Sequence, residues 1–430
     1  MTNIFGVLIA GAVAGIAYGA ATGLDFRAFL DRYHLVFDYA AVMMLLAGQF
    51  ENHLWRIILI VIGSTVYLKV LQGSWAPHAP IYVIPLVNAL VWKMPLIRSR
   101  QSRKGWVFVT GGDSGMGKET ALHLAQKGYD GVFAGCFNLA VATKDFLDAC
   151  KERNIDASRI IPITLDVTSE DSVKGAAETV KSTLRNKEGP YNHLLALVNF
   201  HGVAYNGPAE YMPCDFYTKQ LDVNFVGNIR MVQAFLPMIK EGVAAVRALG
   251  GKDACRRGRV VFTGTGGGAC SPCPSLLSAY MSSKFACEAF CQSLRMELYM
   301  MNHPIDCCMI NPGFVKPTML IEVGQRLAEQ MWSRCKEKLN SDVARVEYGE
   351  MFDHFNRYSA LQPGTHVSKV AEAADRALTA HRPWTSYKVG PDSKAAPIVG
   401  MLPTGIREWV ARHGMYGVLS PAGKVKGYTV

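Results

Sequence analysis

The chain has 430 residues, of which 50% are hydrophobic and 19% are charged, and its formal net charge is +10. This length accommodates one large α/β domain with an additional segment. Basic chains often bind nucleic acid or anionic membranes. The sequence contains no helix-turn-helix, zinc-finger or RNA-binding signature, so we expect no nucleic-acid partner.

An apolar run near the N-terminus, from Ile4 to Leu24, contains no charged residue. About 20 such residues span a bilayer as a helix, and the run lacks the basic start and single cleavage site of a secretory signal. The sequence therefore predicts a retained transmembrane helix. Gly11, Gly15 and Gly19 line one stripe of this helix, either as a face for a second helix or because glycine is common in membrane helices.

Two shorter apolar runs follow at residues 35–50 and 57–71, so we predict a membrane anchor of up to three helices within residues 1–100. With three spans, the basic cluster that follows them places the large domain in the cytosol. We expect the endoplasmic reticulum membrane, with a mitochondrial membrane as the alternative. The C-terminal tail, residues 396–430, is mostly apolar at 398–410 and is a second candidate for membrane contact.

From Trp106 onward, short β-branched runs alternate with amphipathic helical stretches. Such alternation implies a parallel sheet covered by helices on both faces. The predicted fold class is therefore α/β, a Rossmann-type doubly wound parallel sheet within residues 101–395, preceded by the transmembrane helical segment. Strands are predicted at residues 107–110, 131–135, 160–165, 194–199, 259–262 and 305–310, helices at 118–127, 172–185, 215–236 and 278–300, and a surface loop at 241–258.

A glycine-rich turn follows the first predicted strand, where Thr110 precedes Gly111, Gly115 and Gly117, and Lys118 begins a predicted helix. Glycines allow a tight turn and a close approach of the backbone to a phosphate, and the helix N-terminus presents free N–H groups to it. Strand, glycine turn and helix in this order predict a dinucleotide-binding site.

The spacing Thr-Gly-x-x-x-Gly-x-Gly resembles the short-chain dehydrogenase/reductase family, and the resemblance extends over residues 105–390. The other family landmarks follow in order at Asp166, Asn199-Phe-His-Gly202, Asn224, Tyr280-x-x-x-Lys284 and Pro312–Thr318. The resemblance implies a nicotinamide cofactor bound by Gly111, Asp113, Ser114, Gly115, Met116, Gly117, Asp166, Val167, Asn199, Gly202, Tyr280, Lys284, Pro312, Gly313, Val315 and Thr318.

The choice between NAD and NADP depends on charge beside the adenosine ribose, because a 2′-phosphate needs Arg or Lys nearby. The second strand ends at Cys136 with no basic residue next to it, and Asp113 in the glycine turn disfavours a phosphate. We therefore expect NAD rather than NADP. Phe200 and His201 stand where the family usually has Asn and Ala, and they place bulk in a cofactor-facing turn.

Tyr280 and Lys284 are four residues apart on a predicted helix, so their side chains lie on one face. A free phenol has a pKa of about 10, and a neighbouring ammonium favours the phenolate. The pair is therefore suited to exchange a proton with a substrate oxygen during hydride transfer. The resemblance implies that Lys284 also holds the nicotinamide ribose, and that Asn224 fixes a water that relays protons to Lys284.

The family places a substrate-orienting Ser before this Tyr, and the usual spacing falls on Gly267. Alignment of the preceding strand puts Thr265 at the Ser position instead, where the hydroxyl is kept with a stiffer rotamer. Thr263, Ser275 and Ser278 are the alternatives. The departure leaves open another class of function, a catalytically weak protein that binds dinucleotide or lipid.

Within the family, the segments near Cys136, at 331–348 and at 382–390 resemble the branch of retinol, steroid and 3-hydroxybutyrate dehydrogenases. A membrane anchor suits a lipophilic alcohol or ketone, such as a steroid or retinoid. The alternative is a small hydroxy acid, which needs a cation for its carboxylate, and His201 and Lys316 are the candidates. The resemblance also implies a substrate lid around residues 319–362, with either an apolar inner face or ordinary core packing at Met319, Leu320, Met331, Trp332, Met351, Phe352 and Phe355.

All eleven cysteines follow Asp130, in irregular spacings that do not indicate a disulfide scaffold. Cys270 and Cys273 form one CxxC without a second pair, and Cys287 and Cys291 lie four apart on a predicted helix. We expect buried or unreactive thiols and no metal. A homodimer is compatible with the resemblance, because members of the family often associate through helices.

Overall fold

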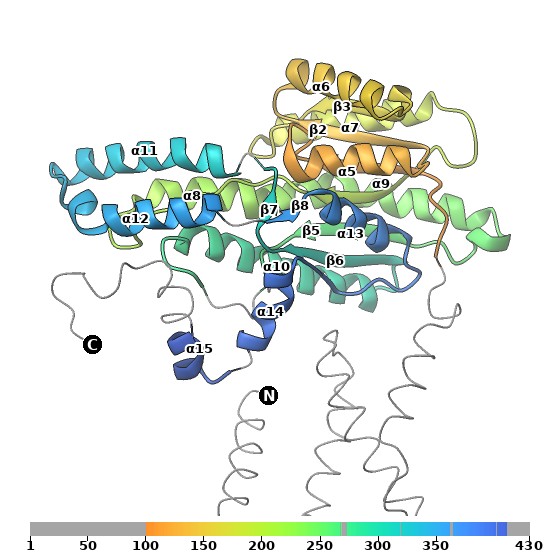
Figure 1. Cartoon of the computed structure of the whole chain (residues 1–430). Coiled ribbons are helices and arrows are strands. Elements are labelled where there is room, and N and C mark those ends of the chain that lie inside the picture. Colours follow the sequence, from red (N-terminus) through yellow and green to blue (C-terminus); the bar gives the residue numbers. More distant parts are fainter. Residues whose placement is uncertain are drawn as a thin grey trace, which may run out of the picture. The chain divides into compact units, whose positions relative to one another are not determined.

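The computed structural model describes residues 100–410, except 267, 269–272, 319, 362–363 and 401 (Figure 1). The chain divides into two units, Met1–Ser99 and Arg100–Val430, and only the second contains described residues. The three predicted membrane helices all precede residue 100 and therefore lie outside the described part. Within that part, no helix combines the length and the apolar character needed to cross a bilayer.

A seven-stranded parallel sheet runs through the second unit in the order β3-β2-β1-β4-β5-β6-β9 (Figure 1). The strand order reverses between β1 and β4, which pair directly although β2 and β3 separate them in the sequence. In such sheets the ligand crevice lies at the carboxyl ends of the strands beside the reversal. The strands are β1 (Trp106–Thr110), β2 (Gly131–Cys136), β3 (Ile160–Thr164), β4 (Leu194–Asn199), β5 (Gly258–Thr263), β6 (Ile305–Pro312) and β9 (Ser386–Val389).

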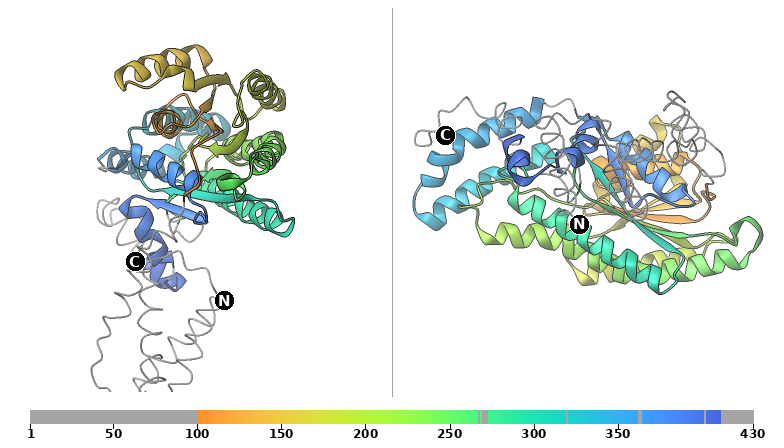
Figure 2. Two further views of the ribbon diagram at one scale, coloured as in Figure 1. Left: turned by 90° about the vertical axis from the view of Figure 1, so that its right-hand side faces the viewer. Right: turned by 90° about the horizontal axis from the view of Figure 1, so that it is seen from below.

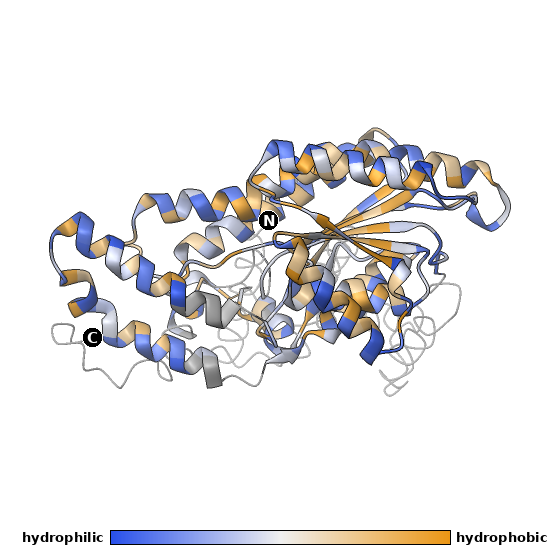
Figure 3. Ribbon diagram, turned by 90° about the horizontal axis from the view of Figure 1, so that it is seen from above, coloured by the Kyte–Doolittle hydropathy of each residue, from blue (hydrophilic) through white to orange (hydrophobic). Residues whose placement is uncertain are grey.

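Helices cover both faces of this sheet (Figure 2), so the predicted α/β fold is confirmed. The strands are apolar along most of their length, whereas the helices mix polar and apolar residues (Figure 3), because strands between two helical layers are buried on both faces. One face carries α5 (Gly115–Gln126), α6 (Leu139–Glu152) and α13 (Ser368–Thr379), and the other carries α7 (Glu170–Arg185), α9 (Gly227–Ala248) and α10 (Ser278–Met300).

The predicted surface loop at residues 241–258 is wrong over its first half, because α9 continues to Ala248. Gly242 is a poor helix former, but a Cβ at this position would lie 2.5 Å from the carbonyl oxygen of Leu194. Glycine therefore lets the helix pack directly on β4, where Val243 and Val246 are fully buried. Burial of one helical face overrides the low propensity of the sequence.

The predicted lid consists of two helices, α11 (Leu320–Leu339) and α12 (Val343–Leu361), which extend from the sheet together with α8 (Cys214–Leu221) (Figure 1). Met331, Trp332 and Phe352 are buried in one cluster with Phe216 of α8. The rings of Trp332 and Phe352 meet edge to face, with their centres 5.3 Å apart. Core packing, rather than an inner face over the substrate, therefore accounts for these three side chains.

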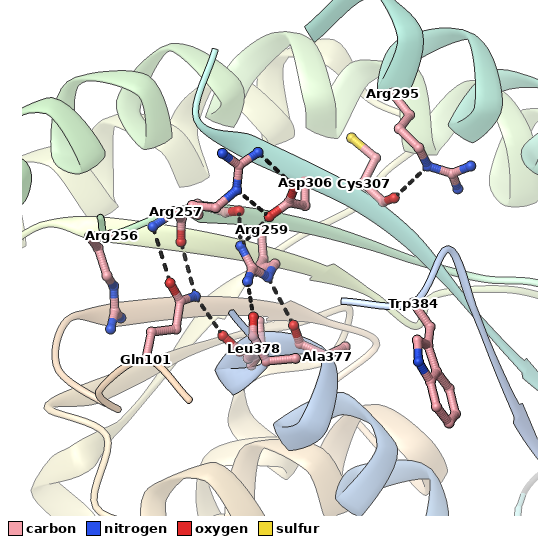
Figure 4. Close-up of polar contacts among 12 residues, drawn as sticks. Gln101, Arg256, Arg257, Arg259, Arg295, Asp306, Cys307, Ala377, Leu378 and Trp384 are labelled. Carbon is pink, nitrogen blue, oxygen red and sulfur yellow. Dashed lines mark hydrogen bonds and ion pairs between the residues drawn. The ribbon is translucent and has the colours of Figure 1, made fainter. Parts of the chain in front are cut away.

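Polar contacts at the amino-terminal edge of the sheet join β5, β6 and α13, and they bind Gln101 to the domain (Figure 4). The side chain of Arg259 on β5 is 1% exposed and donates to the Asp306 carboxylate at 2.6 Å and to the carbonyl of Ala377 at 2.9 Å. Gln101 donates through Nε2 to the carbonyl of Leu378 at 2.8 Å. Residues before β1 are thus part of the folded domain.

The remaining described elements connect the main helices and strands or lie in the C-terminal part of the chain. A π-helical turn at Asp222–Val226 joins α8 to α9. The others are 3-10 helices at Ala157–Arg159 and Gly251–Asp253, the short parallel pair β7 (Val315–Lys316) and β8 (Thr365–His366), and the helices α14 (Pro391–Gly400) and α15 (Thr404–Val410).

Candidate active site

A cavity of about 780 Å³ lies at the carboxyl ends of the strands, beside the reversal between β1 and β4. Every predicted cofactor-site residue except Asn199 lines this cavity, and so does Thr265. Asn199 and Asn224 are buried and are not among the lining residues. The carboxyl edge of one sheet thus gathers motifs that lie more than a hundred residues apart.

The glycine turn forms one wall of the cavity. Gly111 and Gly115 have φ angles of +67° and +54°, which are strained for other residues. A Cβ on Gly117 would lie 2.1 Å from the carbonyl oxygen of Gly111, so only glycine lets α5 begin this close to β1. The first turn of α5 therefore faces the cavity with unpaired backbone N–H groups, a cradle that fits a pyrophosphate.

A second wall follows β3 and carries Asp166, one of the predicted cofactor contacts. The Oδ1 atom of Asp166 accepts from the backbone N–H of Thr168 at 2.9 Å and from its hydroxyl at 2.7 Å. Arg230 of α9 donates to the carbonyl of Val167 at 3.1 Å and to Asp222 at 2.8 Å. These bonds hold the loop in place while leaving Oδ2 of Asp166 to accept from a ligand amine.

Asp113 connects the glycine turn to the end of β2. Its carboxylate accepts from the backbone N–H groups of Phe137 at 2.8 Å and Asn138 at 2.9 Å. A negative charge therefore lies where the chain leaves β2, the place at which this fold receives an adenosine ribose. Phe137 lines the cavity with a side chain that is 73% exposed.

Tyr280 and Lys284 lie one turn apart on α10, and both line the cavity, as their spacing predicts. The buried Nζ atom of Lys284 donates to the carbonyl of Thr263 at 3.1 Å. It lies 5.7 Å from the centre of the Tyr280 ring. The bond to β5 thus fixes an ammonium group near the phenol.

The candidate hydroxyls differ in the partners that they already have. Thr263 donates its hydroxyl hydrogen to the carbonyl of Asn199 at 2.7 Å, and Ser278 is hydrogen-bonded to the hydroxyl of Tyr217 at 2.6 Å. Thr265 lines the cavity together with Tyr280. Ser275 and Ser278 are not among the lining residues, so the arrangement favours Thr265 over the three alternatives. Gly267 lies outside the described residues.

Asn224 lies in the π-helical turn between α8 and α9, behind the cavity wall. Its side-chain amide donates to the carbonyl of Val203 at 2.9 Å and to the hydroxyl of Ser283 at 3.0 Å, and its Oδ1 accepts from the N–H of Val203 at 2.8 Å. The backbone carbonyl oxygen of Asn224 accepts from the Cys287 thiol at 2.9 Å. Asn224 therefore ties the turn after β4 to α10, and the predicted water relay stays a prediction.

His201 replaces the small residue of the family pattern and also lines the cavity. Thr110 Oγ1 accepts from the N–H groups of Phe200 at 3.0 Å and His201 at 3.2 Å, so its own hydrogen goes to His201 Nδ1 at 2.8 Å. Burial, aided by the charge of Lys284, lowers the pKa of His201 to about 3. A neutral ring does not supply the cation that the small hydroxy acid alternative requires.

The cavity is also lined by residues outside the predicted set of site residues, and Phe137, Thr168, Phe314 and Val223 are examples. Phe137 and Thr168 follow parallel strands closely, and Phe314 follows β6, so the rule that ligands meet the carboxyl ends could have indicated all three. Val223 offers no such signal, because it depends on the π-helical turn.

Within the described part of the chain, no group of three His, Cys, Asp or Glu side chains could hold a metal ion. Cys287 and Cys291 are buried, and burial raises the pKa of both thiols, that of Cys291 to about 12. These thiols are therefore protonated and poor ligands at neutral pH. Cys270 lies outside the described residues.

The short chain dehydrogenase family model matches residues 105–328, which include the glycine turn, Asn224, Tyr280 and Lys284. The chain belongs to this family. It is accordingly an alcohol dehydrogenase or reductase that acts on CH–OH groups.

Two curated relatives and one solved structure illustrate the similarity of this short-chain dehydrogenase to known proteins. The mitochondrial D-beta-hydroxybutyrate dehydrogenase of Bos taurus is 31% identical over 286 residues, 65% of this chain and 75% of that protein. Retinol dehydrogenase 5 of Mus musculus is 30% identical over 328 residues, 72% of this chain and 89% of that protein. A short chain dehydrogenase/reductase of Burkholderia phymatum, solved in complex with NAD, shares the fold with a TM-score of 0.52, 17% identity, and coverage of 69% and 92% of the two chains.

Proposed function

We propose that this short-chain dehydrogenase transfers a hydride between NAD(H) and a lipophilic alcohol or ketone, such as a steroid or retinoid, at a membrane. The observation that carries the proposal is the shared cavity, in which Tyr280 and Lys284 face the glycine turn that begins at Gly111. When bound, the nicotinamide would supply or accept the hydride. The residues of the chain would bind both partners and move the proton.

Tyr280 is the acid and base of this mechanism. Its phenol gives a proton to the substrate oxygen during reduction, and its phenolate takes one from the alcohol during oxidation. The ammonium group of Lys284 is held by the carbonyl of Thr263 at 3.1 Å, and its Nζ atom lies 5.7 Å from the centre of the Tyr280 ring. Thr265 donates a hydrogen bond that orients the substrate oxygen, and Asn224 keeps the turn at Val203 in position.

NAD is favoured over NADP because Asp113 places a carboxylate between the glycine turn and the end of β2. A 2′-phosphate at that position would meet a like charge, whereas a ribose hydroxyl could donate to it. The other predicted cofactor residues act as the family resemblance implies, with phosphate contacts on the glycine turn, adenine contacts at Asp166 and Val167, and nicotinamide contacts between Pro312 and Thr318.

The composition of the cavity supports a lipophilic substrate. His201 is neutral, so Lys284 is the single cation among the described lining residues. The proposed mechanism already uses Lys284 beside the phenol, so it is not available to bind a substrate carboxylate. Lys316, the other candidate partner for a carboxylate, does not line the cavity. The chain is similar both to a retinol dehydrogenase and to a D-beta-hydroxybutyrate dehydrogenase, so the choice between the substrates rests on the cavity.

Membrane attachment is proposed from the sequence of the N-terminal unit. Residues 1–100 supply the anchor, residues 101–395 form the catalytic domain, and residues 396–430 form a tail that contacts the bilayer. The exposed side chains of Ile406 and Trp409 on α15 support the tail contact, since aromatic residues favour the membrane interface. We place the enzyme in the endoplasmic reticulum membrane.

The test is turnover of NAD(H) and NADP(H) by the full chain in detergent with retinoids, steroids and 3-hydroxybutyrate. We expect NAD-linked turnover of a lipophilic alcohol, and a loss of at least about 100-fold on Tyr280→Phe, because general acid–base catalysis contributes about 10²–10⁴-fold. NADH binding should fall far less than turnover, because Tyr280 is one of many predicted cofactor contacts and Phe keeps its ring. Activity on hydroxybutyrate alone would support the small hydroxy acid alternative, and binding without turnover would support the catalytically weak protein.

A further inference from the structure

The turn after β6 lines the cavity with Pro312, Gly313 and Phe314. Proline has no N–H group, so this turn has two backbone donors, and residues of the C-terminal segment accept from both. The N–H of Gly313 donates to the carbonyl of Val389 at 2.8 Å, and the N–H of Phe314 donates to the Asp392 carboxylate at 2.6 Å.

The Asp392 carboxylate fits closely against the turn. A Cβ on Gly313 would lie 1.9 Å from its Oδ1 atom, and a Cβ on Gly390 would lie 2.6 Å from the same atom. The next residue, Ser393, is fully buried and donates to the carbonyl of Asn311 at 2.5 Å. The start of α14 is therefore bound to the chain on both sides of Pro312.

We infer that Asp392 is a positioning residue for the nicotinamide end of the cavity. It lies beyond residues 105–328, the region matched by the family model, and it touches the turn rather than the space inside it. A charged acceptor on a backbone N–H makes a stronger hydrogen bond than a neutral one. This inference rests on the proposed function, which assigns the nicotinamide to the turn at Pro312.

The role of Asp392 is tested by two ligands that share the adenosine half and differ in the nicotinamide. We expect Asp392→Ala to weaken NADH binding to the full chain about tenfold, because the turn loses its charged acceptor. ADP-ribose affinity should stay within twofold of the unmodified protein. Asp392→Asn, which keeps an acceptor oxygen without the charge, should restore part of the NADH affinity.

A second experiment tests the contact between the Asp392 carboxylate and Gly313. Gly313→Ala would push a methyl group into Asp392, so we expect it to impair NADH binding strongly in the original chain. When Asp392 is already replaced by Ala, Gly313→Ala should lower NADH affinity less. The difference between the two losses in this double-mutant cycle measures the contact between Gly313 and Asp392.

The outcomes separate the two proposals. If the unmodified chain binds neither NADH nor ADP-ribose, the proposed function fails. If it binds both, the role of Asp392 is overturned by an equal loss for the two ligands on Asp392→Ala, by no loss for either, or by an Asp392→Asn variant as weak as the alanine variant. Additive effects of Gly313→Ala and Asp392→Ala would contradict the direct contact.

Discussion

The hydrogen bonds that a side chain already makes decide which chemistry it can still perform. The hydroxyl hydrogen of Thr263 is given to the carbonyl of Asn199, so this group can accept from a substrate but cannot donate to its oxygen. A substrate-orienting hydroxyl has to donate when the substrate is a ketone. Thr263 does not meet this requirement, and this distinguishes it from Thr265 as the substrate-orienting residue more clearly than sequence position does.

His201 gives a pH-dependent prediction at the same scale. Burial lowers its pKa from the usual 6.5 to about 3, so between these values the unfolded chain binds a proton that the folded chain does not. Stability therefore falls as the pH falls below 6.5. Between about pH 7 and pH 5, His201 should lower the free energy of unfolding by about 2 kcal/mol, since one pKa unit corresponds to about 1.4 kcal/mol. We expect His201→Gln to abolish this part of the acid sensitivity.

Urea unfolding of both proteins at the two pH values, in the same detergent, measures this difference. The comparison uses the change with pH and not the absolute stability, so a general destabilisation by the substitution does not affect it. Equal acid sensitivity of the two proteins would show that His201 titrates normally and is not held neutral against Thr110.

Among the elements, the amino-terminal edge of the sheet is stabilised by charged hydrogen bonds as well as by apolar packing (Figure 4). Arg257 and Arg259 share the Asp306 carboxylate, with side chains that are 33% and 1% exposed. Arg259 also donates to backbone carbonyls of α13 and of Ala380, where the latter contact is short. The buried member of the pair therefore joins β5, β6 and the end of α13, whereas the other joins two strands.

Replacement of the two arginines should lower the free energy of unfolding of the protein by different amounts. We expect Arg259→Ala to lower the free energy of unfolding by about 3–5 kcal/mol, because it breaks a buried pair and leaves carbonyls without donors. Arg257→Ala, the matched control, should cost about 1 kcal/mol or less, as a partly exposed ion pair does. Urea unfolding measures both, and NADH affinity should be unchanged because the cavity lies at the opposite edge. A larger loss for Arg257→Ala would contradict this account.

Element prediction from the sequence succeeds where burial is uniform. The central strands are continuous apolar runs, and their predicted positions are confirmed within a few residues. Strand β9 is missed because Ser386–Val389 contains Lys388 and has no apolar run, and its pairing with β6 makes it a strand. Helix α9 is cut short for the opposite reason, since Gly242 signals a loop until its packing on Leu194 is known.

At the scale of the whole molecule, site residues fixed by local spacing could be predicted from the sequence, and those that depend on long-range contacts could not. Tyr280, Lys284 and the glycine turn could be predicted, because their spacing within one helix or one turn fixes their geometry. Asp392 could not, since its contact with Phe314 joins positions 78 residues apart. The neutral state of His201 also depends on burial, which no local pattern encodes.

The division into two units leads to the last prediction, which concerns membrane attachment. Every described cavity-lining residue lies between Gly111 and Thr318, so removal of residues 1–99 should leave NADH affinity within twofold while releasing most of the protein from membranes. The cut has to precede Arg100, because Gln101 binds Leu378 and Arg103 pairs with Asp375 at 2.9 Å.

Membrane fractionation of the full and shortened chains, with NADH binding as the control for folding, measures this outcome. A cut at residue 105 should bind NADH poorly or unfold at lower urea, since it removes the contacts of Gln101 and Arg103. If the chain without residues 1–99 binds NADH but stays in membranes, the N-terminal unit is not the main anchor. Release on a further Trp409→Ser substitution would then assign attachment to α15, where that side chain is 60% exposed.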